Sequence, residues 1–482
     1  MNYRGVLFLL GRLQLALAVA LLVPAAVTYF LGGSELRAFL IPAAIVGAAG
    51  IASEALFRQR APFPFGRQEA FLLVSAAWVL ASCLGAIPFI IIKGPAFTID
   101  ALFESTSGFT TTGASVLVDI ESEPPGLLLW RSLMQWLGGM GIVVLGIAVL
   151  PKLAVGGMQL LGAEAPGPTA EKLTPRIAQT AKALWGIYLL LTALEVIALQ
   201  LAGLGLFDAV NHAFTTIATA GFSTRNGSVG AFGNPAVELV VIAFMFVSGI
   251  NFALHFRLLR GKPMPLLRDP EFRFYFWLLI GATALITTDL VVRYQQHDFA
   301  TSLRLGAFQA TSIISTTGYS TADFDAWPNF SRALLFLLMF IGACAGSTGG
   351  SVKIARILIV VKKLVADLKR LVRPHAVLPV RIGRRAVPDE VVAEVTTFFI
   401  MFLVLFGAGG LILALMDLDL VTAFAASAAC LGNIGPGLGL VGPAASYAPL
   451  PGLAKLVLAA LMIIGRLELY TILVTLYLIS RR

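Results

Sequence analysis

The segment DALFESTSGFTTTG, Asp100 to Gly113, is the most informative part of the chain because three further segments follow its pattern. These segments end at Gly221, Gly318 and Gly435 and read DAVNHAFTTIATAG, LGAFQATSIISTTG and TAFAASAACLGNIG. Each reads as a short, partly apolar helix followed by a glycine-bearing loop, too short to span a bilayer. Recurrence of one such unit at comparable intervals indicates a structural element used four times.

Small residues occupy two positions of this unit in all four copies. Twelve residues before the glycine stand Ala101, Ala209, Gly306 and Ala423, and eight before it stand Ser105, Ala213, Ala310 and Ser427. Residues four apart share a helix face, and small residues there let helices approach closely. The pattern therefore predicts four short helices converging on an axis. The alternative, four unrelated Gly-rich connections, does not account for the shared offsets.

The starts of the short helices are less uniform than their ends. Asp100 and Asp208, thirteen residues before their glycines, are expected to cap the first and second helices, and Thr422 the fourth. Leu305 holds this position in the third copy and has no capping oxygen. Capping is therefore predicted for three of the four copies.

The composition is that of a polytopic membrane protein. Hydrophobic residues make up 58% of the 482 residues and charged residues only 13%, which is too apolar for a solvated globular domain. The net charge of +9 comes from short basic segments between apolar runs, a distribution that argues against nucleic-acid binding. The three cysteines show neither paired nor CxxC spacing and predict no disulfide or metal site.

Ten apolar runs are long enough to span a bilayer. They are Val6–Leu31, Phe39–Phe57, Phe71–Ile92, Leu127–Leu150, Ile177–Leu204, Ala236–Leu259, Phe272–Val292, Ala333–Val365, Val391–Met416 and Leu453–Ile479. The sequence thus predicts an all-α membrane protein with two leading helices and four pseudo-symmetric helix, pore loop, helix repeats around a central pore. The expected divisions are a leading segment at 1–67 and repeats at 68–176, 177–268, 269–388 (with a broken second helix) and 389–482.

Basic residues predict the orientation. They follow the second span (Arg58, Arg60, Arg67) and the sixth span (Arg257, Arg260, Lys262, Arg268), and ten Lys or Arg lie between Lys353 and Arg385 against one acid, Asp367. By the positive-inside rule these connections are cytoplasmic, so the four loops enter from outside. The basic stretch from Lys353 fits contact with anionic membrane lipid as well as it fits a protein partner.

The residues at the end of each loop suit a cation without its water shell. Backbone carbonyls can replace water oxygens around an ion, and glycine allows the backbone torsions that this needs. The expected potassium-binding filter residues are Thr111, Thr112, Gly113, Thr219, Ala220, Gly221, Thr316, Thr317, Gly318, Asn433, Ile434 and Gly435. None is acidic, which favours a weakly hydrated monovalent cation over calcium or magnesium.

Together with three other segments, these loops resemble the Trk/Ktr/HKT superfamily of cation transporters. The segments are WRSLMQWLGGMGIVVL (Trp130 to Leu145), GACAGSTGGSVK (Gly342 to Lys353) and GRLELYT (Gly465 to Thr471). The resemblance covers essentially the whole chain, and the two leading helices and the length match the TrkH-type branch. It implies gated potassium uptake through a pseudo-fourfold pore in the bacterial cytoplasmic membrane. It also implies a homodimer controlled by a cytosolic, nucleotide-binding ring of TrkA type, with the nucleotide on that partner and no covalent cofactor here.

The same resemblance assigns the gate. Gly346, Ser347, Thr348, Gly349 and Gly350 interrupt the eighth span, and exposed backbone at membrane depth is tolerable only beside protein or a cavity. The resemblance makes this an intramembrane loop that obstructs the cavity below the filter. A phosphate-binding loop is the alternative, but the required Gly-x-x-x-x-Gly-Lys-Ser/Thr spacing is absent.

Arg466 lies inside the last span, where an unpartnered cation costs about 2.5–3.5 kcal/mol. The resemblance makes Arg466 a pore-facing charge that helps to close the pathway. It also bears on selectivity: in this superfamily a glycine at the first filter position is associated with potassium permeation, and a serine there marks sodium-preferring members. In this chain the residue at that position is Gly113. A structural pair with Glu468 is the alternative for Arg466, although residues two apart point to different sides of a helix.

Other polar residues within or beside the spans are expected to be structural. Glu195 is expected to pair structurally, either between helices or at a dimer contact, and Asp289 is expected to pair with Arg293 at i,i+4. Glu104, His212 and Gln309, each nine residues before its glycine, are predicted to brace the filter without binding a metal. The fourth loop, with Asn433 and Pro436, is expected to be the least regular.

Two other functions make predictions that differ from those of ion conduction. A secondary transporter of a small organic substrate predicts an inverted repeat and a discrete polar pocket, whereas this chain repeats one unit with a single polarity. An intramembrane enzyme needs clustered His, Asp or Glu, which the four scattered histidines do not provide. The sequence therefore favours a non-enzymatic ion pathway.

Overall fold

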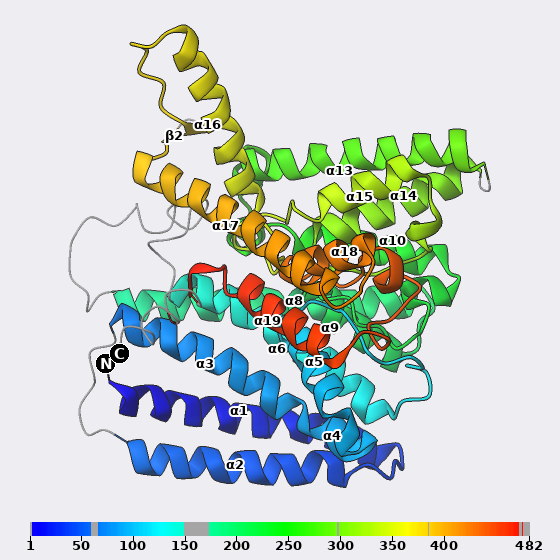
Figure 1. The fold of residues 1–482 in the computed structure, drawn as a ribbon. Coiled ribbons are helices and arrows are strands. Elements are labelled where there is room, and N and C mark those ends of the chain that lie inside the picture. Colours follow the sequence, from blue (N-terminus) through cyan, green and yellow to red (C-terminus); the bar gives the residue numbers. More distant parts are fainter. Residues whose placement is uncertain are drawn as a thin grey trace.

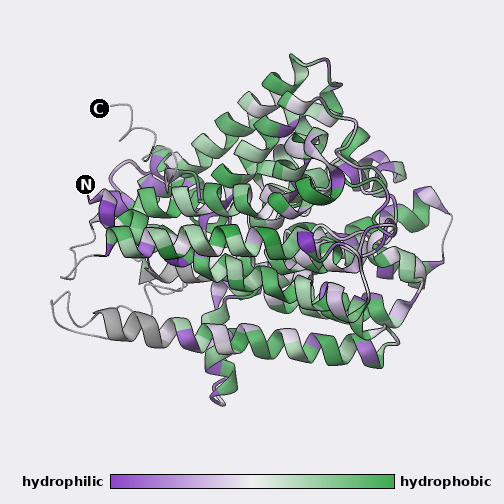
Figure 2. Cartoon of the chain, turned by 90° about the horizontal axis from the view of Figure 1, so that it is seen from below, coloured by the Kyte–Doolittle hydropathy of each residue, from purple (hydrophilic) through white to green (hydrophobic). Residues whose placement is uncertain are grey.

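The computed structural model describes residues 2–58, 66–148, 173–295, 298–383, 385–471 and 475. Within these residues the regular structure is helical, apart from a hairpin of β1 (Arg381–Ile382) with β2 (Arg385–Ala386) and an isolated bridge between Ile341 and Val352. Most of the long helices lie side by side in Figure 1, and α16 (Ile354–Val372) projects away from them. Figure 2 shows that these helices are largely hydrophobic, with hydrophilic residues gathered at helix ends and connections.

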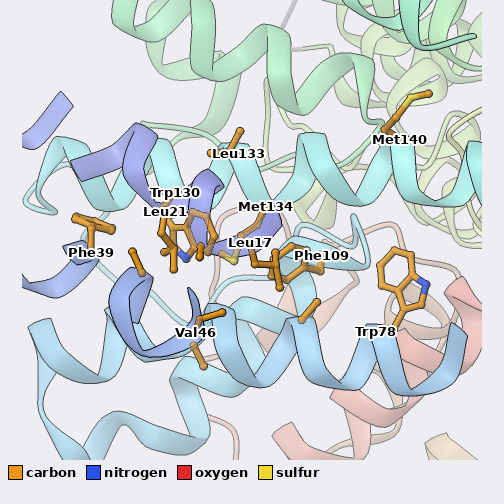
Figure 3. Close-up of a cluster of buried hydrophobic side chains, with 14 of the residues drawn as sticks. Leu17, Leu21, Phe39, Val46, Trp78, Phe109, Trp130, Leu133, Met134 and Met140 are labelled. Carbon is orange, nitrogen blue, oxygen red and sulfur yellow. The ribbon is translucent and has the colours of Figure 1, made fainter. Parts of the chain in front are cut away.

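The leading helices α1 (Tyr3–Phe30) and α2 (Arg37–Phe57) form an antiparallel pair at one edge of the molecule (Figure 1). Helix α1 also packs on α3 (Arg67–Gly85) and α6 (Pro125–Ala148). The buried side chains at this contact are drawn in Figure 3 and include Leu17, Leu21, Phe39, Val46, Trp78, Phe109, Trp130, Leu133, Met134 and Met140. Because lipid offers no hydrophobic drive for helices to associate, this close packing is what joins the leading pair to the first repeat.

Several helices are long and apolar enough to cross a membrane. In the part of the chain that the structure describes, six meet this test, and seven if one bent pair counts as a single span. The sequence predicts ten. Three of the others are accounted for by structure: one is the bent pair, one is interrupted between α15 (Asn329–Leu338) and α16, and the last breaks after α19 (Gly452–Arg466).

The bent pair consists of α10 (Pro235–Ser248) and α11 (Phe252–Leu259), which meet at 100°. The bend has a local cause, because Asn251 caps α11 by accepting from the amide of Ala253 at 2.9 Å. The amide of Phe252 then donates to the carbonyl of Gly346 at 3.0 Å. The bend therefore attaches this span to the interrupted segment between α15 and α16.

The four repeated segments form four short helices. They are α5 (Thr98–Phe109), α9 (Leu206–Ile217), α14 (Phe299–Ile314) and α18 (Leu420–Leu431). Each ends four residues before its glycine, and the small residues at both predicted offsets are fully buried. The shared offsets thus report a common packing environment, as expected from the sequence.

The predicted helix caps were wrong. The N-caps of α5 and α9 are Phe97 and Gly205, three residues before the expected aspartates, so that Asp100 and Asp208 lie in the first turn, where a carboxylate still suits the helix dipole. Asp100 pairs with Lys455 there, and Asp208 with Arg225 at 3.1 Å. In the fourth copy the cap is Asp419, whose carboxylate accepts from the amide of Thr422 at 3.0 Å.

The remaining elements connect or flank these units. The other helices are α4 (Ile87–Lys93), α8 (Leu173–Leu201), α12 (Met264–Leu267), α13 (Pro270–Asp289) with a π turn at Leu290–Tyr294, and α17 (Asp389–Ala414), and short 3₁₀ helices lie at Pro95–Phe97, Ser228–Phe232, Phe324–Ala326 and Gly439–Val441.

Candidate functional site

All four short helices end in the same hydrogen-bonded turn. In the first copy the amide of Thr111 donates to the carbonyl of Gly108 at 3.0 Å, and that of Thr112 donates to the carbonyl of Ser107 at 2.9 Å. The corresponding amides of the other three copies make the same two bonds at 2.9 to 3.2 Å. This pair of bonds is the Schellman motif, which places a left-handed residue just after the helix. The loops therefore share one backbone geometry.

The left-handed residue stands two before the glycine in every copy. Its φ is 53° at Thr111, 50° at Thr219, 61° at Thr316 and 53° at Asn433. A β-branched residue rarely adopts this conformation, and such strain costs about 1–3 kcal/mol per residue. Three threonines held there by their surroundings mark these turns as candidates for a functional role.

The four loops close into a ring in chain order. A Cβ atom added to each glycine would lie less than 3.0 Å from the carbonyl oxygen of the residue just before the glycine of the next loop, and the fourth glycine faces the first loop. The pairs are Gly113 with Ala220, Gly221 with Thr317, Gly318 with Ile434, and Gly435 with Thr112. All four carbonyl-bearing residues are fully buried. The predicted filter residues therefore come together, and glycine is required because the neighbouring carbonyl fills the space of a side chain.

Hydroxyl groups support the first and third loops in the same manner. The side-chain oxygens of Thr110 and Thr112 lie 2.8 Å apart, and those of Ser315 and Thr317 lie 2.7 Å apart. These hydrogen bonds join the helix end to the residue before the glycine. Opposite quarters of the ring thus carry matching side-chain bonds.

The fourth loop closes the ring through its side chains. The Nδ2 group of Asn433 donates to Oγ1 of Thr112 at 3.0 Å and to the carbonyl of Met462 at 2.9 Å. The hydroxyl of Tyr447 donates to the carbonyl of Gly435 at 2.7 Å. The expected irregularity is confined to the glycine, whose φ is 103° against 80° or 81° in the other copies. The turn before it is the common one.

Two of the three predicted bracing residues hold the strand that follows the glycine. A carboxylate oxygen of Glu104 accepts from Oγ of Ser115 at 3.0 Å, and Nε2 of His212 lies 3.0 Å from Oγ of Ser223. Both serines stand two residues after their glycine. Gln309 is different, because neither of its amide atoms has a hydrogen-bond partner among the described residues. In that part of the chain no three His, Cys, Asp or Glu residues are grouped to hold a metal.

Helix α6 supplies two buried side chains to the loops, of which Arg131 joins the first loop to the second and Gln135 binds the second. The Nε group of Arg131 donates to Glu104 at 2.8 Å and its Nη1 group donates to the carbonyl of Ser223 at 3.1 Å. Four residues on, the amide of Gln135 bonds to the second loop. Neither residue is among the site residues predicted from the sequence. The available signal was two polar residues spaced by four in an otherwise apolar run, which predicts one polar helix face.

Outside the ring the connections after the first and second glycines also meet. The Nδ2 group of Asn226 donates to the carboxylate of Asp119 at 3.2 Å, and the amide of Ile120 donates to Oδ1 of Asn226 at 2.7 Å. The hydrogen bond from Asn226 lowers the pKa of Asp119 from its ordinary value. The side chain of Asn226 therefore joins the two connections by binding one side chain and one backbone amide of the first.

The predicted gate residues lie against the second, third and fourth loops. The hydroxyl of Thr348 accepts from that of Thr219 at 3.1 Å and donates to the carbonyl of Ile217 at 3.0 Å. The amide of Gly350 donates to Oγ1 of Thr316 at 2.8 Å, and a Cβ atom on Gly350 would crowd the carbonyl of Gly432. The interrupted segment is thus hydrogen-bonded to the helix ends that carry the left-handed residues.

The interrupted segment is anchored at both ends by one carboxylate. Oε1 of Glu271, near the start of α13, accepts from the amide of Ala345 at 2.6 Å and from that of Ala355 at 3.0 Å. The amide of Cys344 donates to the carbonyl of Gly249 at 3.0 Å. These bonds satisfy backbone groups that a broken helix would leave unpaired in the membrane.

Arg466 reaches this segment from the end of α19. It is 2% exposed, and its guanidinium donates to the carbonyl of Thr348 at 2.9 Å and to that of Gly138 at 3.3 Å. The alternative of a pair with Glu468 is wrong, because Glu468 binds Lys353 at 3.2 Å and also Arg356. The charge of Arg466 is therefore met by carbonyl dipoles.

Of the other predicted pairs, one is present in the structure. Asp289 and Arg293 form the expected ion pair at 3.3 Å, and Asp289 also accepts from the hydroxyl of Ser331 at 2.6 Å. Glu195 is fully buried and forms no ion pair within the described residues, so that its expected pairing stays a prediction. Arg60 of the basic segments lies outside those residues.

A family model and individual relatives place the chain with the same group of proteins. The family model described as "TrkH: Cation transport protein" matches residues 37–480. The chain is 43% identical over 410 residues to the Trk system potassium uptake protein TrkH of Escherichia coli (strain K12), covering 84% of each chain. It is 38% identical to the protein of the same name from Halomonas elongata, covering 98% of both chains.

A solved structure resembles the whole chain. The crystal structure of the potassium transporter TrkH from Vibrio parahaemolyticus matches with a TM-score of 0.91 at 36% sequence identity, over 99% of this chain and 99% of that chain. The likeness therefore extends over the leading helices and all four loops.

Proposed function

The chain belongs to the TrkH family of cation transport proteins, and from that premise we propose that it takes up potassium across the bacterial cytoplasmic membrane as the pore subunit of a Trk system. The ion passes through the ring formed by Gly113, Gly221, Gly318 and Gly435. Backbone carbonyls of the residues before these glycines replace the water shell of the ion. The membrane potential drives uptake with about 2.3 kcal/mol per charge per 100 mV.

The closed ring of four like turns is the observation that supports this proposal most directly. Each carbonyl before a glycine lies against the glycine of the preceding loop, so oxygen atoms from all four loops surround one axis. None of the ring residues is acidic. Such an array suits a weakly hydrated monovalent cation, whereas calcium and magnesium favour carboxylate ligands.

The gate consists of residues Gly346 to Gly350 together with Arg466. Two contacts support this assignment: Thr348 is hydrogen-bonded to Thr219 of the second loop, and its carbonyl accepts from Arg466. A fixed positive charge at this depth raises the barrier for a cation leaving the ring. Opening requires this segment to leave the loops.

The architecture that accompanies this function has ten spans, two of them leading helices and eight paired around the four loops. The repeats occupy 68–176, 177–268, 269–388 and 389–482, after a leading segment at 1–67. The protein acts as a homodimer with a cytosolic ring of TrkA type that binds the regulating nucleotide. Basic connections on the side opposite the loops meet that ring and anionic lipid.

Rubidium uptake into liposomes that hold the purified protein tests this function, with Gly113→Ser measured in parallel. Uptake that depends on the protein and is competed by potassium is expected. The serine variant is expected to lose preference for potassium over sodium, because its side chain would meet the carbonyl of Ala220. Absence of uptake even with the cytosolic partner and nucleotide would refute transport. An unchanged ion preference in the variant would remove Gly113 from the filter.

A further inference from the structure

The side chain of Gln135 holds the backbone on both sides of one filter glycine. Gln135 lies on α6 and is fully buried. Its Nε2 group donates to the carbonyl of Ala220 at 2.7 Å, and its Oε1 atom accepts from the amide of Phe222 at 3.0 Å. The glycine between these two residues is Gly221. A side chain from the first repeat thus fixes the filter strand of the second.

The carbonyl that Gln135 engages is one of the four in the ring. Its oxygen lies against Gly113 of the first loop. The equivalent carbonyls of Thr112, Thr317 and Ile434 accept no side-chain hydrogen bond among the described residues. One quarter of the ring therefore differs from the other three in the chemistry of its oxygen, although all four backbones follow the same turn.

A hydrogen bond to this oxygen changes what it offers to a cation. A carbonyl oxygen has two lone pairs, and one of them is directed to Nε2 of Gln135. The bond holds the direction of the carbonyl and draws electron density from it. The number and field strength of coordinating carbonyls contribute to discrimination between potassium and sodium, and a stronger field favours the smaller ion.

We propose that Gln135 is a specificity-determining positioning residue, whose amide weakens and orients the carbonyl of Ala220 so that the ring prefers potassium. This inference rests on the proposed function of the ring. It goes beyond it by assigning part of the selectivity to a side chain outside the four loops. Arg131 lies one helical turn earlier, and its guanidinium carbon lies 4.1 Å from the ring centre of Phe222. Arg131 therefore contacts the same strand that Gln135 binds.

The chain offers a matched control. Gln309 is also fully buried and lies on the third pore helix, yet its amide has no hydrogen-bond partner among the described residues. Replacing Gln309 by methionine removes a buried amide without removing a bond to the ring. Any effect common to both glutamines reports lost amide polarity in the core, whereas an effect of Gln135 alone reports the bond to Ala220.

The experiment measures potassium, rubidium and sodium fluxes in proteoliposomes for wild type, Gln135→Met, Gln135→Leu and Gln309→Met. Gln135→Met is expected to keep potassium and rubidium flux and to raise the sodium to potassium permeability ratio. The expected rise is about fivefold, which is the size of effect that one hydrogen bond can produce. Gln309→Met is expected to keep the wild-type ratio. Gln135→Leu is of similar size and has no donor, so it provides the comparison if the methionine variant does not fold.

The outcomes separate this inference from the proposed function. If wild type carries no ion even with the cytosolic partner and nucleotide present, the transport function itself fails. If wild type conducts with potassium preference and a folded Gln135 variant keeps its ratio, the role of Gln135 is refuted while transport stands. An equal shift in Gln309→Met would also overturn the inference.

Discussion

The guanidinium of Arg466 and the carbonyl of Thr348 form a hydrogen bond of 2.9 Å between the last helix and the segment that interrupts the eighth span. The same threonine is bonded through its hydroxyl to Thr219 of the second loop. A charge, a broken helix and a filter loop are therefore connected through one residue. Any movement that opens the pathway at this point has to break these bonds.

Arg466→Ala is expected to raise ion flux in the absence of the cytosolic partner by roughly tenfold or more. Hydrogen bonds to a charged group contribute about 1.5–3 kcal/mol each, and the variant loses two that favour the closed arrangement. Rubidium uptake into proteoliposomes without partner or nucleotide measures the effect. Arg293→Ala, at a side chain that is 67% exposed, is the control and should leave basal flux unchanged. Equal flux in Arg466→Ala and wild type would argue against the gate.

Gly350→Ala is expected to loosen the same gate from the other side. The new methyl group would lie 2.5 Å from the carbonyl of Gly432, so that the segment has to shift away from the fourth loop. Basal flux should increase several-fold. Gly407→Ala provides a matched control, since no atom lies within 4 Å of its added Cβ. A variant at Gly350 with low basal flux and unchanged stability would contradict the predicted contact.

The four ring glycines are expected to tolerate alanine unequally. The added Cβ atom meets its neighbouring carbonyl most closely at Gly318 and least closely at Gly435, where the distance is 2.7 Å. Potassium uptake should therefore be abolished in Gly318→Ala and retained in part in Gly435→Ala. Uptake assays at equal amounts of folded protein give the order. The reverse order would show that the ring has another arrangement in the conducting state.

The buried ion pair of Arg131 and Glu104 is expected to matter more for stability than surface pairs do. Breaking a buried pair leaves an unpaired charge and costs about 3–5 kcal/mol, whereas an exposed pair contributes about 0–1 kcal/mol. Arg131→Met and Glu104→Gln should each lower the melting temperature strongly in detergent. The double variant should lose much less than the sum of the two single losses, because it leaves no unpaired buried charge. Arg12→Ala, at an exposed pair, should have little effect. Additive losses would show that the two side chains act separately.

The sequence predicted the parts of the site that repeat. The common offsets before Gly113, Gly221, Gly318 and Gly435 predicted four equivalent turns, and the structure brings these turns together in one ring, because small residues and a terminal glycine are local requirements of each copy. The sequence also predicted the interruption of the eighth span at Gly346 to Gly350, because consecutive Gly, Ser and Thr residues do not favour a continuous membrane helix.

The sequence could not predict contacts between repeats. Gln135 and Ala220 are 85 residues apart, and only the packing of α6 against α9 brings them together. The capping errors at Asp100 and Asp208 have a different cause. Both carboxylates found partners elsewhere, so the helices could begin earlier than the usual capping residue suggested.

The closed order of the ring also constrains how the chain can change over time. Each glycine is confined by an oxygen that belongs to the next loop, and the last is confined by the first. No quarter of the ring can therefore drift alone: a bulkier residue in one copy demands a compensating change in its neighbour. Duplicated segments that have lost most of their sequence identity would be expected to keep these four positions longest.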